Sequence, residues 1–123
     1  MMNNTFFMAL LSILMSVVAQ FVLKAGMSSE SVRQVLGQPI TVQTVVTVGL
    51  NGLVVLGFAL YGLGAVVWLG VLSTWDVSKA YPLVGLGFML SLLVGFITGE
   101  DVTILRGAGV ALIALGVWLV VQS

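Results

Sequence analysis

The residues best suited to bind a polar ligand lie in the first long apolar segment, residues 5–25. Ser12, Ser16, Gln20 and Lys24 recur at every fourth position, which places them along one side of a helix. An ionisable side chain within a membrane is costly and usually faces other helices or a water-filled cavity. We call these four residues the polar stripe, and it is the first candidate for a binding site.

Each residue of the polar stripe also has a simpler interpretation. Lys24 lies near the end of its segment, where a lysine can extend its amine to the lipid headgroups; the residues alone favour this role. Gln20 can form a hydrogen bond to a neighbouring helix, although it lies one turn deeper and reaches the headgroups less easily. Ser12 and Ser16 are the least informative, because a serine in a membrane helix often bonds to a carbonyl of the preceding turn.

The composition identifies an integral membrane protein. Of its 123 residues, 60% are hydrophobic and only 7% are charged, and the mean hydropathy is +1.25; about a quarter of residues are charged in soluble domains. Four Lys and Arg residues balance four Asp and Glu residues, so no basic surface is available for nucleic acid. Without His or Cys, the usual transition-metal ligands and cysteine nucleophiles are missing. We therefore expect no enzymatic activity, cofactor, metal or nucleic-acid partner.

Four apolar segments are long enough to cross a bilayer, which takes about 20 residues as a helix. The sequence therefore predicts a single all-α domain, residues 1–123: a four-transmembrane-helix bundle with both termini on one side of the membrane. A short helix is expected over 28–36, and a short interfacial helix over 41–49, before the second span. The start of the chain lacks the positive region of a signal peptide, so we expect the first span to be retained. The predicted spans are residues 5–25, 52–72, 77–97 and 102–121.

Small residues and turns complete this plan. Glycines recur in the second, third and fourth spans, and small residues let membrane helices approach closely. Tyr81 and Pro82 lie near the start of the third span, where a proline is least costly. Glu100, Asp101 and Arg106 are most simply explained as a solvated turn followed by a helix cap. Aromatic residues near span ends fit an interfacial belt; these are Trp68, Trp75, Trp118 and Tyr81.

Three stretches together resemble the drug/metabolite transporter superfamily. They are SVVAQ at 16–20 followed by Lys24, LYGLGAVVWLGVLSTWDVSKAYPL at 60–83, and the Gly-Glu turn at 99–100 followed by GAGVALIALGVWLV at 107–120. Within the superfamily, the chain most resembles the small four-span subunits of the aminoarabinose–undecaprenyl phosphate flippase pair. It shares with them the Ser…Gln…Lys spacing of the first helix and a tryptophan thirteen residues before a tyrosine, here Trp68 and Tyr81.

The chain is also similar, more distantly, to the small multidrug resistance family of the same size. Members that exchange protons for cationic drugs or guanidinium carry a glutamate eight residues before the position matching Lys24, and here that position is Ser16. A serine cannot exchange a proton near neutral pH, and a positively charged stripe would repel a cationic substrate. Proton-coupled cation export is therefore disfavoured, and the site suits an anion.

The flippase resemblance implies a polyprenyl (undecaprenyl) phosphate-linked sugar as the substrate, moved across the bacterial cytoplasmic (inner) membrane. Its phosphodiester would accept a charge-assisted hydrogen bond from the lysine of the stripe, while the glutamine and a serine supply neutral donors. Aromatic residues would stack on the sugar, and basic residues would receive the headgroup at either surface. The implied substrate-binding residues are Lys24, Gln20, Ser16, Trp68, Tyr81, Lys79 and Arg106.

Four short helices cannot enclose a sugar headgroup and also bury their small-residue faces, so we expect a dimer with the fourth span at the interface. Lys79 lies on the side of the termini and Lys24, Arg33 and Arg106 on the other. This weak charge bias permits an antiparallel homodimer, whereas the resembled flippase pairs two different subunits. Two alternatives remain open: an exporter of drugs or small metabolites like the small multidrug resistance proteins, and a non-transporting assembly subunit of a larger membrane complex.

Overall fold

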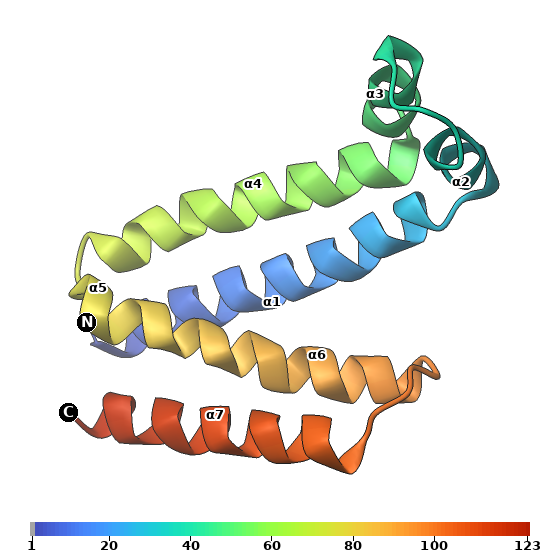
Figure 1. The fold of residues 1–123 in the computed structure, drawn as a ribbon. Coiled ribbons are helices and arrows are strands. Elements are labelled where there is room, and N and C mark those ends of the chain that lie inside the picture. The colour runs from blue at the N-terminus through green and yellow to red at the C-terminus, as the bar shows by residue number, and fades with distance from the viewer. Residues whose placement is uncertain (1) are drawn as a thin grey trace.

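The computed structural model describes residues 2–123, with side chains from residue 4 onward, and no strand occurs in that range. Four helical segments are long and apolar enough to cross a membrane, which confirms the all-α, four-span fold class. They alternate in direction, so the start of α1 and the end of α7 lie at the same end of the molecule (Figure 1). The elements are α1 (Met2–Met27), α2 (Glu30–Leu36), α3 (Val42–Gly49), α4 (Gly52–Leu72), α5 (Val77–Ala80), the 3-10 turn η1 (Tyr81–Val84), α6 (Gly85–Ile97) and α7 (Ile104–Gln122).

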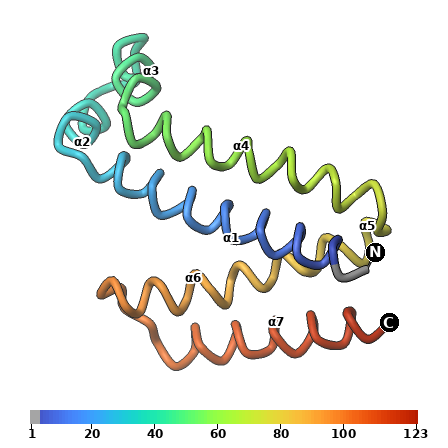
Figure 2. The backbone as a smooth tube through the Cα atoms, turned by 180° about the vertical axis from the view of Figure 1, so that it is seen from behind, coloured from blue at the N-terminus to red at the C-terminus, as the bar shows by residue number. Residues whose placement is uncertain are grey.

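The four long segments form two pairs that diverge. α1 packs along α4, and α6 packs along α7. The pairs lie closest at the end where α5 is found, and they separate toward the end that carries α2 and α3 (Figures 1 and 2). The molecule is therefore closed at one end and splayed at the other.

α1 and α4 approach closely because glycines of α4 face α1. A Cβ atom on Gly57 would lie 2.6 Å from the Leu23 side chain, and one on Gly64 would lie 3.3 Å from the Ser12 carbonyl oxygen. At the second contact the Ser12 hydroxyl donates a hydrogen bond of 2.7 Å to the Gly64 carbonyl. Small residues at close helix contacts are the usual solution within a membrane, and this bond fixes the rotation of α1 about its axis.

The closed end holds the main hydrophobic core. It forms where α1, the last turn of α4 and the α5–η1 segment meet, and Phe6, Trp68 and Trp75 pack around it. Close packing of this kind resists deformation, so the closed end is the fixed part of the bundle. The buried residues of the cluster are Ala9, Ile13, Val17, Val71, Ala80 and Leu83.

The third span is not one uniform α-helix. It begins as α5, passes through the 3-10 turn η1 and continues as α6. Pro82 lies in the first turn of η1, and a proline cannot donate the backbone hydrogen bond that an α-helix would need there. As a result Leu83 is completely buried in the core while the neighbouring Tyr81 is exposed.

The two short helices between the first and second spans are present as α2 and α3. Asn51 joins them to the bundle, because its side-chain oxygen accepts hydrogen bonds from the N–H groups of Leu53 (3.0 Å) and Val54 (3.2 Å) at the start of α4. The amide nitrogen of Asn51 donates to the Ser29 hydroxyl at the start of α2 (3.1 Å). The location of α3 at the membrane interface stays a prediction.

α7 is the least covered of the long helices. Val117 is the one buried residue among its described side chains, and the helix rests on Gly85, where an added Cβ would lie 2.8 Å from both Ile113 and Val117. The glycines at 109 and 116 face open space, with nothing within 4 Å of an added Cβ. Most of the surface of α7 is thus free of contacts within the chain.

The close approach of α1 and α4 predicts different effects for two glycines of the same helix. Gly57→Ala places a methyl group 2.6 Å from Leu23, whereas Gly62→Ala meets nothing within 4 Å. Both changes gain the same helix propensity, so their difference isolates the clash. We expect Gly57→Ala to be less stable than Gly62→Ala by about 1–3 kcal/mol, measured as unfolding in detergent. Equal stabilities would contradict the packing described here.

Candidate functional site

A groove follows the polar stripe between α1, α4 and α6. It consists of three adjacent cavities of about 230, 200 and 360 Å³, and each shares lining residues with the next. Trp68 and Tyr81 line the groove toward the closed end of the bundle, and Lys24 and Glu100 line it at the splayed end. We call this continuous feature the stripe groove.

The structure places three of the four stripe residues on the groove with polar atoms available. Ser16 lines two of the cavities, although its hydroxyl also donates 2.8 Å to the Ile13 carbonyl. Gln20 and Lys24 are exposed and line the part nearer the splayed end. Ser12 differs, because it is buried and its bond joins α1 to α4, whereas the bond of the half-buried Ser16 stays within α1. The stripe therefore contributes one structural serine and three candidate ligand contacts.

The end of the groove toward η1 is aromatic. Trp68 from α4 and Tyr81 from η1 line the same cavity. Tyr81 is 66% exposed, so its ring is available to a ligand rather than packed in the core. Tyr61 from α4 lines this cavity and the next one. Aromatic rings with a polar tip bind amphipathic ligands well.

The opposite end of the groove is charged. The Lys24 ammonium donates a hydrogen bond of 3.0 Å to Glu100 Oε2, which is also an ion pair between α1 and the loop before α7. The two side chains are 61% and 36% exposed. An ion pair with this exposure contributes little to stability, so either partner can be exchanged for a ligand at low cost.

Two glycines place Glu100 in this position. Gly99 adopts a φ of +93°, a conformation that other residues rarely take. The turn returns the chain onto α6, where the Glu100 N–H donates 2.8 Å to the Gly95 carbonyl. An added Cβ on Gly95 would lie 3.1 Å from Glu100 Oε1. The turn that the sequence suggested is present, and it also directs a carboxylate toward Lys24.

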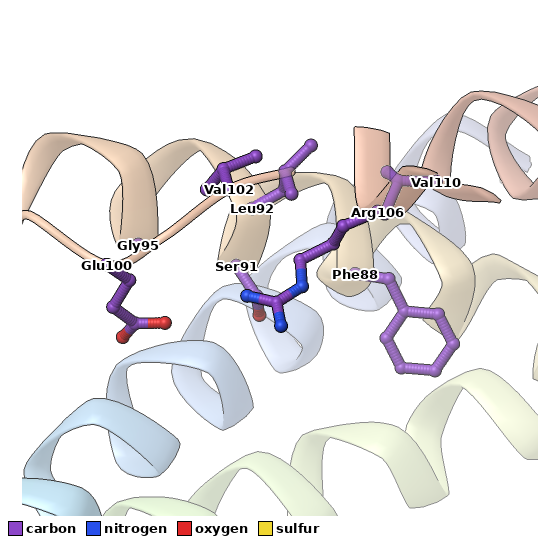
Figure 3. Close-up of a pocket in the computed structure, with 8 residues that line it drawn as sticks. All are labelled: Phe88, Ser91, Leu92, Gly95, Glu100, Val102, Arg106 and Val110. Atoms are coloured by element: carbon purple, nitrogen blue, oxygen red, sulfur yellow. The ribbon is translucent and has the colours of Figure 1, made fainter. Parts of the chain in front are cut away.

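Arg106 lies beside the charged end rather than within the stripe groove. It lines a fourth cavity of about 230 Å³ between α6 and α7, together with Ser91 and Glu100. Its Nη1 atom donates to the Asp101 carbonyl, 2.6 Å away. Figure 3 shows the Arg106 guanidinium and the Glu100 carboxylate pointing to the same side, toward α1. Arg106 and Lys24 thus line two cavities that share Glu100.

Lys79 is the implied site residue that lies apart. It belongs to α5 at the closed end, and its ammonium is 4.6 Å from the centre of the Trp75 ring, a cation–π contact. Phe6 also lies near the Trp75 ring, and the centres of the two rings are 6.4 Å apart. Lys79 is absent from the lining of the cavities described above.

Three polar lining residues, Tyr61, Ser91 and Glu100, were not among the site residues predicted from the sequence. Tyr61 and Ser91 are isolated polar residues within apolar spans. That isolation is the one feature of the sequence that could have indicated a role in the groove. Ser91 lines the second and third cavities as well as the one beside Arg106. Glu100 was interpreted only as part of a solvated turn, because no local pattern indicates that it meets α1.

The stripe groove combines polar and apolar walls along helices that can span a membrane. Val17, Val84 and Phe88 supply apolar surface beside the hydroxyl, amide and charged groups. Such a lining suits a ligand with a polar head and a long apolar tail, because the head can be hydrogen-bonded while the tail stays in lipid.

The chain is similar to bacterial proteins that are named as flippase subunits. No protein-family model matches the chain, and no solved structure matches it significantly. A Proteus mirabilis protein named "Probable 4-amino-4-deoxy-L-arabinose-phosphoundecaprenol flippase subunit ArnF" is 32% identical over 99% of this chain and 95% of its own length. The ArnE subunit so named in Pseudomonas savastanoi is 47% identical over 51% of this chain, and an ArnF subunit of Photorhabdus laumondii is 40% identical over 54%.

The extent of these matches differs. The aligned segment spans 56% of the length of the Pseudomonas and Photorhabdus relatives, about half of each protein, whereas the Proteus relative aligns almost from end to end. With four helices able to cross a membrane and bacterial relatives of this kind, the chain is a multi-pass protein of the bacterial cytoplasmic membrane. It belongs to the family of 4-amino-4-deoxy-L-arabinose-phosphoundecaprenol flippase subunits.

Proposed function

We propose that the chain is a subunit of a flippase that moves an undecaprenyl-phosphate-linked amino sugar across the cytoplasmic membrane. The observation that carries the proposal is the stripe groove, a polar path along membrane-spanning helices. It occurs in a chain whose near full-length relative is named for a lipid of this kind. In this role the chain binds and transports a lipid and performs no chemical reaction on it.

The phosphodiester of the lipid binds at the stripe. Lys24 supplies a positive charge, and a charge-assisted hydrogen bond is about twice as strong as a neutral one. Gln20 and Ser16 follow at one-turn intervals. Gln20 can donate to phosphate or sugar oxygens as the headgroup passes, and Ser16 can do so by turning its hydroxyl away from the Ile13 carbonyl. The order of these residues gives an anion a series of partners through the apolar region.

The headgroup occupies the two ends of the groove in succession. The α1 residues at its ends, Ser12 and Lys24, are twelve positions apart, which corresponds to about 18 Å along a helix. One sugar with its phosphate cannot extend over that length. The aromatic end, with Trp68 and Tyr81, therefore stacks on the sugar at a different stage from the stage at which Lys24 holds the phosphate.

Basic residues stand near both membrane surfaces in this arrangement. Arg106 lies in the first turn of α7 next to the charged end of the groove, and Lys79 lies in α5 at the opposite end of the molecule. Each can attract an anionic headgroup before it enters the groove or after it leaves. Lys79 acts only at the surface, since it does not line the groove.

A second four-span subunit completes the transporter. Gly109 and Gly116 are seven residues apart, so they share one face of α7, and that face is uncovered within the chain. Small residues on a membrane helix favour close contact with another helix. The partner is a second copy of this chain or a related subunit, and α7 forms the contact.

Loss of the positive charge at the stripe should abolish most transport. For Lys24→Met we expect a fall of roughly 10- to 150-fold, because a hydrogen bond to a charged group contributes about 1.5–3 kcal/mol. Transport is measured in vesicles containing the full chain and any copurifying subunit, as the appearance of the lipid amine to a membrane-impermeant reagent. Arg33→Gln, an exposed cation outside the groove, is the matched control. Equal rates for both variants would remove Lys24 from the site.

The aromatic end should contribute less than the charged end. Trp68→Leu keeps an apolar side chain but removes the ring that lines the groove, and aromatic stacking contributes about 0.5–1.5 kcal/mol. We expect transport to fall roughly 2- to 10-fold. Trp118→Leu, which alters an exposed ring on α7, should leave the rate unchanged in the same assay. The reverse order of effects would contradict the proposed sugar contact.

If the uncovered face of α7 forms the dimer interface, a large side chain on that face should prevent dimer formation. Gly109→Leu should convert the dimer to monomers in detergent, because a large side chain separates the two backbones. Gly62→Leu on α4, which also faces open space, should leave the dimer intact. The measurement is molar mass by light scattering, with the micelle contribution subtracted. A dimer that survives Gly109→Leu would assign the interface to another face.

A further inference from the structure

The ion pair at the charged end of the stripe groove has two members, and the proposed function uses only one of them. We propose that Glu100 binds the ammonium group of the ligand, so that the site selects headgroups carrying both a phosphate and an amine. The inference rests on the proposed function, because it concerns the same groove and the same class of lipid.

Lys24 and Glu100 pair with each other, with 3.0 Å between the Lys24 ammonium nitrogen and Glu100 Oε2. A phosphate that binds Lys24 competes directly with this carboxylate. If the ligand brings only a negative charge, Glu100 loses its cation and lies beside a second anion. Repulsion between like charges at a binding site disfavours the wrong ligand, so a simple anion is bound weakly here.

Glu100 cannot easily move away from the incoming phosphate. Its N–H is bonded to the Gly95 carbonyl at 2.8 Å, and the positive φ of Gly99 fixes the turn before it. The carboxylate also lies against Gly95, where there is no room for a side chain without displacing it. The carboxylate is therefore held beside Lys24 at this end of the groove.

Other cations do not replace Lys24 as the partner of Glu100. Within residues 4–123, Lys24 is the one basic residue that forms an ion pair with Glu100. Arg106 lines the neighbouring cavity with Glu100, but its guanidinium donates to the Asp101 carbonyl. In Figure 3 the carboxylate extends from the loop before α7 and the guanidinium from α7 itself, with the carboxylate directed toward α1.

An amino sugar joined to a phosphate can bind without leaving the Glu100 carboxylate unpaired, because the two ion-pair partners exchange. Its phosphate takes the Lys24 ammonium, and its own ammonium, one sugar ring away, takes the Glu100 carboxylate. One ion pair is replaced by two, so every charge remains paired as the headgroup enters the groove. A sugar phosphate without the amine, or with the amine acylated, leaves Glu100 unpaired and is disfavoured.

The test compares three lipids on the full chain by native mass spectrometry in detergent: undecaprenyl phosphate linked to 4-amino-4-deoxy-L-arabinose, its N-acetyl derivative, and undecaprenyl phosphate alone. We expect the wild-type chain to bind the free amine at least about tenfold more tightly than the N-acetyl form. Glu100→Gln retains the size of the side chain and a hydrogen-bond acceptor but not the charge. It should lose that preference, through weaker binding of the amine and unchanged or tighter binding of the N-acetyl lipid.

Two controls separate the possible outcomes. Asp101→Asn, the adjacent exposed acid, should keep the wild-type preference. Lys24→Gln should weaken the binding of all three lipids. If this variant binds them as tightly as the wild-type chain does, the result contradicts the proposed phosphate site rather than the role of Glu100. If Glu100→Gln retains the preference for the free amine while Lys24→Gln weakens every lipid, the role of Glu100 is overturned and the phosphate site stands. Absence of binding by the wild-type chain contradicts the proposed function itself.

Discussion

The packing of α1 against α4 is the contact on which the site depends. Because Gly64 has no side chain, the two backbones come close enough for the Ser12 hydroxyl to reach its carbonyl. That bond fixes the rotation of α1, and residues at four-position intervals on a helix share a face. The directions of Ser16, Gln20 and Lys24 are therefore fixed together. A bilayer core offers no water that could replace the bond, so the orientation holds through the apolar region.

The parts of the structure that follow from local patterns could be predicted from the sequence. Long apolar segments must be helical in a membrane, since their backbone groups need internal hydrogen bonds, and the four helices are present. The spacing of the polar stripe also predicted that Ser16, Gln20 and Lys24 would follow one line, and all three line the groove. Their role in binding a lipid phosphate remains a proposal.

The parts that depend on how distant segments cross could not be predicted in the same way. Lys24 and Glu100 are 76 positions apart, and their contact requires both the approach of α6 to α1 and the unusual conformation of Gly99. Tyr61 and Ser91 face the groove because of helix rotation, which a weakly patterned apolar span does not specify. The charged end of the groove contains one feature of each kind: Lys24 could be predicted from local spacing, and its partner Glu100 could not, because their contact depends on long-range packing.

The 3-10 turn in the third span has a consequence for movement. At η1 (Tyr81–Val84) the backbone changes from one hydrogen-bonding pattern to another, and such interruptions often act as hinges. Leu83 of this turn is anchored in the core of the closed end. A rotation about η1 would move α6 and α7 together relative to α1 and α4, and would widen the bundle only at the splayed end. If the chain transports a lipid as we propose, one subunit would open its groove toward one membrane surface only.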